Sequence, residues 1–226
     1  MTGPNKAILI NKKKLTNKVI ELTFKHEGLF KAKAGQFINI KIEDKEKFPC
    51  FRAYSFSSLK KNEFKLCVTI IENGRGSSFL NNLKIGNEIF FIGPSGKFNI
   101  TNNTTHTFIA TGSGIAPIKA IIEKIKNKNQ TINLFFGLRN EEDIYYDDFF
   151  QNIKNEKFNY ILSLSSPSEK WTREKGRVSN YLNEKQIKNF KKSSFYICGN
   201  PEMVKDCEEI LLKKGIDQTN IITEKY

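Results

Sequence analysis

The first half of the chain consists of short hydrophobic or alternating runs separated by turn-forming residues. The runs cover residues 19–24, 36–42, 64–71 and 88–92, and clusters rich in glycine, asparagine and proline lie between them. Several short strands at this spacing are typical of an antiparallel β-barrel or sandwich. Residues 77–83, directly after Gly74-Arg75-Gly76, predict one short helix before the last strand.

Beyond the polar stretch 101–105 the pattern changes to buried-type strands that alternate with helical segments. The predicted strands are 107–110, 132–136, 160–164, 194–198 and 220–223, and the predicted helical segments are 117–126, 146–154, 178–182 and 201–214. This alternation predicts right-handed crossover units and a parallel sheet. We therefore expect two domains, an antiparallel β-barrel over residues 1–101 and an α/β domain over residues 102–226.

Charge and cysteine content narrow the function classes. The net charge is +13, but 32 of the 37 basic residues are lysine, and the lysine runs at 12–14 and 191–192 have no interleaved aromatic residues for stacking on bases. We favour a basic face that attracts an acidic protein partner over nucleic-acid binding. The cysteines (Cys50, Cys67, Cys198 and Cys207) form no CxxC pair, and with two histidines in the chain we expect neither a zinc site nor an iron–sulfur cluster.

No stretch of the chain has the roughly 18 uninterrupted apolar residues that a membrane helix needs. The first residues also lack the hydrophobic stretch of a signal peptide. We therefore expect a soluble, cytoplasmic protein without a membrane span, and free thiols in a reducing compartment.

Two segments are suited to phosphate. Residues 111–117, Thr-Gly-Ser-Gly-Ile-Ala-Pro, follow a strand and open a helix, where small residues let backbone amides approach a pyrophosphate. The segment lacks a full GxGxxG pattern, so a tight turn without a ligand is the alternative. The second segment, Gly74-Arg75-Gly76-Ser77-Ser78, lies at the start of the helix predicted over residues 77–83 and offers backbone amides and hydroxyls to a phosphate.

Residues 52–55, Arg-Ala-Tyr-Ser, add a guanidinium for phosphate, an aromatic ring for stacking on a flat ring, and a hydroxyl for a ring nitrogen. Because phosphate-ready segments occur in both halves, we expect two nucleotide-like ligands that meet at a cleft between the domains.

Six ordered motifs resemble the ferredoxin–NADP(+) reductase family, and together they span nearly the whole chain. They are Arg52-Ala53-Tyr54-Ser55, Gly76-Ser77-Ser78, Gly93-Pro94-Ser95-Gly96-Lys97-Phe98, the segment 112–117, Cys198-Gly199-Asn200-Pro201-Glu202-Met203-Val204, and Glu224-Lys225-Tyr226. The resemblance implies an FAD-binding barrel, an NADP(H)-binding second domain, and hydride transfer between nicotinamide and flavin. It also implies a separate ferredoxin or flavodoxin as the one-electron partner.

The resemblance also implies residue roles. Arg52, Gly76, Ser77 and Ser78 would bind the FAD pyrophosphate, Tyr54 would pack on the isoalloxazine, and Ser55 would contact its N5 edge. Thr111, Gly112, Gly114, Ile115 and Pro117 would hold the pyrophosphate of the nicotinamide nucleotide. Cys198, with Gly199, would lie beside the nicotinamide C4, Glu224 would complete the polar wall, and Tyr226 would cover the other flavin face until nicotinamide displaces it.

One part of the pattern departs from the family. The Ser-Arg that serves NADPH after the third strand of the nucleotide domain is replaced by Ser165-Ser166-Pro167. Charge for a 2′-phosphate would then come from Lys170, Arg173, Lys175 or Arg177. We favour NADPH, with NADH as the alternative.

The alternative functions are an NADH-linked reductase component for an oxygenase, free flavin or ferric siderophore, and a non-catalytic electron-transfer subunit. The acidic runs 141–143 and 147–148 are predicted helix starts rather than general bases.

Overall fold

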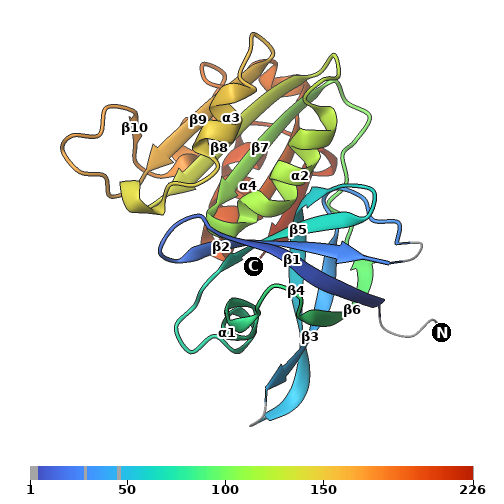
Figure 1. The fold of residues 1–226 in the computed structure, drawn as a ribbon. Helices are drawn as coiled ribbons and strands as arrows, with labels where there is room; N and C mark the ends of the chain where they lie inside the picture. Colours follow the sequence, from blue (N-terminus) through green and yellow to red (C-terminus); the bar gives the residue numbers. More distant parts are fainter. Residues whose placement is uncertain (1–4, 28–29, 45–46, 226) are drawn as a thin grey trace.

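The computed structural model describes residues 5–27, 30–44 and 47–225, which form two domains (Figure 1). The first is a closed barrel in which the strand order is β1-β2-β5-β4-β3-β6. All neighbouring strands in it are antiparallel. The strands are β1 (Asn5–Lys14), β2 (Val19–His26), β3 (Phe37–Asp44), β4 (Lys47–Leu59), β5 (Glu63–Thr69) and β6 (Glu88–Ser95), and helix α1 (Arg75–Asn82) connects β5 to β6.

Aromatic residues fill the barrel. Phe24, Phe56, Phe64 and Phe91 are almost completely buried, and the ring of Phe30 packs among them. Phe56 and Phe91 meet the Phe64 ring edge-on, with centroids 5.3 and 5.7 Å away. Such edge-to-face pairs hold a core in one arrangement.

The second domain is a six-stranded parallel sheet in the order β10-β9-β8-β7-β11-β12. Its strands are β7 (Thr105–Thr111), β8 (Thr131–Leu138), β9 (Phe158–Leu164), β10 (Glu174–Lys175), β11 (Ser194–Gly199) and β12 (Ile221–Lys225). Its helices are α2 (Ile115–Ile125), α3 (Asp147–Asn152) and α4 (Pro201–Lys213), with 3₁₀ turns η1 (Gly112–Gly114), η2 (Glu141–Asp143), η3 (Val178–Tyr181), η4 (Phe190–Lys192) and η5 (Gln218–Asn220).

Helices cover both faces of this sheet (Figure 1). Residues of α2 and α3 share one hydrophobic cluster with Phe108, Phe136 and Leu162, whereas α4 packs on the opposite face against Phe135 and Ile197. The α2–α3 cluster also includes Val19, Cys67 and Phe98 from the barrel side. The two domains are therefore joined by continuous apolar packing.

The expected fold class, a barrel followed by an α/β domain, is confirmed. The sequence pattern marked neither β1 nor β4, although β4 carries the Arg52–Ser55 motif. The segment 178–182, predicted as helical, forms only a short 3₁₀ turn, η3.

Membrane-spanning helices and metal centres are both absent from the described ranges. None of the helices in these ranges is long and apolar enough to cross a membrane. Among the same residues, no group of three or more His, Cys, Asp and Glu side chains is placed to hold a metal ion.

Candidate functional site

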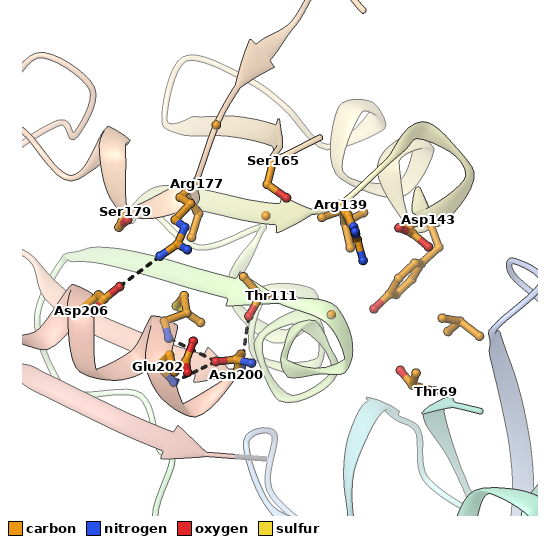
Figure 2. Close-up of a pocket in the computed structure, with 18 of the residues that line it drawn as sticks. Thr69, Thr111, Arg139, Asp143, Ser165, Arg177, Ser179, Asn200, Glu202 and Asp206 are labelled. Carbon is orange, nitrogen blue, oxygen red and sulfur yellow. Dashed lines mark hydrogen bonds and ion pairs between the residues drawn. The ribbon is translucent and has the colours of Figure 1, made fainter. Parts of the chain in front are cut away.

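The carboxyl ends of the parallel strands converge on a cavity of about 440 Å³ (Figure 2). An open α/β sheet binds ligands at this edge, where the strand order reverses. The reversal here lies between β7 and β11, since the chain moves outward to β8 and β9 before returning to β11. The walls include Thr111, Gly112, Gly137, Arg139, Asp143, Tyr145, Ser165, Arg177, Ser179, Asn200, Glu202 and Asp206.

The turn after β7 forms part of this cavity. Gly112 has φ +52° and no atom lies within 4 Å of the position of an added Cβ, so its main chain is open toward a ligand. Gly114 is the opposite case, because an added Cβ would lie 2.2 Å from the Cys198 carbonyl oxygen. Ile115 and Pro117 are buried on α2. The turn thus exposes one glycine and uses the other to pack α2 against β11.

Cys198, the penultimate residue of β11, is fully buried and lies opposite Ala110 of β7 and Glu224 of β12. The next residue, Gly199, has φ +145°, and an added Cβ would lie 2.4 Å from Thr111 Oγ1. Asn200 then accepts a hydrogen bond from the Glu202 amide at 2.8 Å and caps α4. The Asn200 amide also donates to Thr111 Oγ1 at 3.2 Å, which ties the end of β11 to the end of β7 at the cavity.

A second cavity, of about 480 Å³, lies against the barrel. It is lined by Arg52–Ser55 of β4, the end of β5, and Gly74–Ser77 at the start of α1. An added Cβ on Gly76 would lie 2.6 Å from Tyr54 Oη and 3.0 Å from Arg52 Cγ, so glycine is required for this close approach. Burial raises the pKa of Tyr54 to about 12, which keeps its phenol neutral.

The serines at the start of α1 have different surroundings. The Ser77 hydroxyl accepts a hydrogen bond from the Ile71 amide at 3.1 Å and donates to the Gly74 carbonyl at 3.1 Å. The Ser78 amide is bonded to the Gly74 carbonyl at 2.8 Å. The first-turn amides of Gly76 and Ser77 have no intrahelical partner by geometry and lie at the cavity wall, where they suit an anion.

The two cavities adjoin. Thr69 lines both, and Ser113 and Ala116 of the turn after β7 line the barrel-side cavity. Across this junction the Ser55 hydroxyl donates to Glu224 Oε1 at 3.1 Å. The structure therefore brings together Ser55 and Glu224, two residues expected beside the reacting rings that are 169 positions apart. The predicted Tyr226 lies outside the described residues.

The four basic residues expected near a 2′-phosphate differ in what their side chains contact. Arg173 is bonded to both Asp147 carboxylate oxygens, at 2.8 and 3.2 Å, and stacks on Trp171. Arg177 lines the first cavity, at the carboxyl ends of the parallel strands, where its guanidinium lies 3.7 Å from Asp206 (Figure 2). Lys170, in the loop before β10, and Lys175, on β10, are both exposed. Among these four described residues, Arg177 is the one that lines the cavity.

The acidic runs have the predicted structural role. Residues 141–143 form η2, and the Asn140 amide donates to Asp143 Oδ2 at 3.2 Å. Asp147 and Asp148 form the first turn of α3. Sequence reasoning missed other residues at the cavity (Thr69, Arg139, Asp143, Ser179, Asn200 and Asp206). Their position just after parallel strands was the available signal for Arg139 and Asn200.

Comparisons with known proteins agree with this geometry. An oxidoreductase FAD-binding domain model matches residues 6–100, and an oxidoreductase NAD-binding domain model matches residues 108–209. The chain is 30% identical to the toluate 1,2-dioxygenase electron transfer component of Pseudomonas putida, over 97% of this chain and 67% of that protein. It is 28% identical to a component of the Na(+)-translocating NADH-quinone reductase of Methylococcus capsulatus, over 82% of this chain and 51% of the relative.

Solved structures share the fold over nearly the whole chain. Ferredoxin-NADP+ reductase from Plasmodium falciparum, solved with 2′P-AMP, has a TM-score of 0.83 and 26% identity, covering 99% of this chain and 96% of that one. A ferredoxin NADP+ reductase from Neisseria gonorrhoeae has a TM-score of 0.86 at 23% identity, covering 100% and 99%. The chain spans about two thirds of the toluate component and about half of the quinone reductase component.

Proposed function

Since this chain belongs to the ferredoxin–NADP(+) reductase family of FAD-dependent oxidoreductases, we propose that it oxidises NADPH and delivers electrons singly to a separate ferredoxin or flavodoxin. The observation that carries the proposal is the junction of the two cavities, which share Thr69 and are bridged by the Ser55–Glu224 hydrogen bond. Bound FAD would supply the chemistry, taking a hydride from the nicotinamide and releasing single electrons.

The barrel-side cavity suits the flavin. Arg52 and the first-turn amides of α1, at Gly76 and Ser77, would bind its pyrophosphate, because a guanidinium and unpaired helix amides both favour an anion. We assign Ser78 to the same group. Tyr54, neutral at physiological pH, would pack its ring on the isoalloxazine.

The first cavity, at the carboxyl ends of the parallel strands, suits the coenzyme, and we call it the nucleotide cavity. The turn at residues 111–117 would hold its pyrophosphate, with Gly112 presenting open main chain to it. Ser55, Cys198 and Glu224 would surround the reacting atoms. The Ser55–Glu224 bond fixes the serine hydroxyl at the boundary between the domains, and Ser55 is 4% exposed, so little water reaches it. Orientation and exclusion of water are the contributions expected of the protein in such a reaction.

NADPH is favoured by the residues around the end of β9. Ser165 directly follows that strand, and Ser179 and Arg177 line the same cavity. Hydroxyls and an arginine suit a phosphate dianion, whereas an acidic side chain suits the free ribose of NAD. The ion pair between Arg177 and Asp206 is exposed and 3.7 Å long. Such a pair is weak, so the guanidinium remains available to a phosphate.

Coenzyme kinetics test this proposal. The FAD-loaded protein should show a higher kcat/KM with NADPH than with NADH. Arg177→Ala should lower kcat/KM for NADPH by roughly 10- to 100-fold, the usual worth of a charged hydrogen bond, and leave NADH nearly unaffected. Lys170→Ala, on the same loop but outside the cavity, is the control. A wild type that prefers NADH, or an Arg177→Ala effect equal for both coenzymes, would contradict the assignment.

A second candidate is an NADH-linked reductase component for an oxygenase. It is favoured by the 30% identity to the toluate 1,2-dioxygenase component and by the Asp206 carboxylate at the cavity. The acceptor discriminates between the two candidates. Under the first, a small acidic ferredoxin or flavodoxin is reduced rapidly at low ionic strength, in keeping with the +13 charge of the chain. Under the second, electrons reach an oxygenase while those carriers react slowly.

A further inference from the structure

Lys119 is a charged residue buried between the two domains. It lies on α2, and its side chain is only 6% exposed. Its ammonium donates to the Ser57 carbonyl of β4 at 3.3 Å and to Glu123 Oε1 at 2.5 Å. It also lies over the rings of Tyr146 and Phe149, 5.0 and 4.5 Å from their centroids. A buried ammonium needs such partners, because leaving water is costly for a charge.

A second contact ties the same two domains. The Tyr146 hydroxyl donates to Glu21 Oε2 at 2.7 Å, and Lys65 donates to Glu21 Oε1 at 2.7 Å. Glu21 lies on β2, and its side chain is 8% exposed. Burial acts to raise the pKa of Glu21, but the bonds from Lys65 and Tyr146 outweigh it, and the pKa is lowered. The carboxylate therefore stays ionised and keeps the tyrosine hydroxyl oriented.

These contacts connect the segments that would hold the two reacting rings. Lys119 is one turn after Ile115, where α2 leaves the turn that borders the nucleotide cavity. The carbonyl that it binds, Ser57, is two residues from Ser55 on the same strand. Tyr146 follows Tyr145, which lines the nucleotide cavity. In the described part of the chain, Lys119 itself lines neither cavity.

We propose that Lys119 is a positioning residue: by tying α2 to β4 it fixes the distance and angle at which nicotinamide meets flavin. The inference rests on the proposed function only in its nicotinamide-to-flavin step, and applies equally to NADPH and NADH. A stabilising role alone is the weaker explanation, because a buried ion pair adds little net stability over apolar side chains of similar volume. What the ammonium adds is direction, since its bond to the Ser57 carbonyl fixes one relative placement of the domains.

Lys119→Met tests the proposal, since methionine keeps most of the volume and removes the charge. Glu123, whose side chain is 27% exposed, can be solvated in the variant. The matched control is Lys124→Met, an exposed lysine on the same helix. In stopped-flow single turnovers with whichever coenzyme reduces the wild type faster, Lys119→Met should lower the flavin reduction rate by about 10-fold or more, since a displacement of about 1 Å can cost 10²-fold.

Two further readouts separate positioning from loss of structure. The long-wavelength charge-transfer absorbance seen at saturating coenzyme should weaken, because it depends on ring overlap. The dissociation constants of FAD and of the oxidised coenzyme should stay within about 2-fold. Removing one partner of a buried ion pair lowers the thermal midpoint, so rates and dissociation constants are measured below the unfolding transition of every variant. Equal reduction rates in Lys119→Met and Lys124→Met would overturn the proposal. So would a rate loss that only tracks weaker cofactor binding.

Tyr146→Phe provides an independent test if Lys119→Met does not fold. It keeps the ring under the ammonium and removes only the hydroxyl bonded to Glu21. A several-fold slower flavin reduction with unchanged dissociation constants is expected, and an unchanged rate would overturn the proposal. A wild type reduced only by NADH would contradict the NADPH assignment while leaving this test intact.

Discussion

Gly114 offers a direct test of how the nucleotide domain holds its cavity. In Gly114→Ala the new methyl would lie 2.2 Å from the Cys198 carbonyl oxygen and 2.6 Å from the Gly199 nitrogen. Heavy atoms in contact prefer about 3.5–4 Å, so the start of α2 must move by roughly 1 Å or more from β11. Both opposing atoms belong to the main chain and cannot rotate away. Overpacking of this kind costs about 1–3 kcal/mol.

The assay is thermal unfolding combined with NADP⁺ titration. For a chain of this size, about 1 kcal/mol lowers the midpoint by about 2–4 °C, so Gly114→Ala should unfold roughly 4–12 °C below the wild type. Gly112→Ala is the control: its φ of +52° costs an alanine only about 1 kcal/mol, and its methyl meets no protein atom but points into the cavity. It should therefore lose NADP⁺ affinity with a small change in midpoint. A Gly114→Ala midpoint within about 2 °C of the wild type, or a Gly112→Ala midpoint below that of Gly114→Ala, would refute the reasoning.

Three other outcomes are expected. Tyr226→Ser should strengthen nicotinamide binding if that aromatic ring covers the flavin, and an unchanged titration would contradict the covering role. Raising the ionic strength should slow reduction of an acidic carrier more than reduction of an uncharged quinone, because the chain carries +13; equal slowing would argue against steering. Burial lowers the pKa of His106 to about 4, below its unfolded value of about 6.5, so the unfolded state binds more protons between these values. The free energy of unfolding should therefore fall by about 2 kcal/mol from pH 7 to pH 5, and urea titrations of His106→Gln should lack this loss.

The fold was largely predictable because hydrophobic periodicity differs between the two halves. Strands β2, β3, β5 and β6 were marked by short apolar runs between turn formers, and the strand–helix alternation marked the parallel sheet. β4 was not marked, because Arg52, Tyr54 and Ser55 interrupt its apolar pattern to serve the cavity. The helix predicted over residues 178–182 was wrong, because this segment is too short to form more than one turn of 3₁₀ structure.

The candidate site was predictable where a motif fixes local geometry, and not where long-range packing decides. Thr111 and Gly112 line one cavity, and Arg52–Ser55 line the other, whereas Gly114, Ile115 and Pro117 of the same turn line neither. The ion pair of Arg173 could not be predicted from the sequence, because its partner Asp147 is 26 residues away on α3. For the same reason, nothing in the local sequence distinguished the buried Lys119 from the exposed lysines around it.

Continuous packing across the barrel–sheet boundary limits how far the two halves can be separated. Val19, Cys67 and Phe98 on the barrel side belong to the same cluster as Ile118 and Ile121 of α2. A nucleotide half expressed alone would expose the part of this cluster that the barrel covers, and exposed apolar patches of this kind promote aggregation. A chimaera that exchanges one half for that of a relative would need a complementary surface grafted with it. The interface between the two halves would therefore have to be kept as one unit in such an exchange.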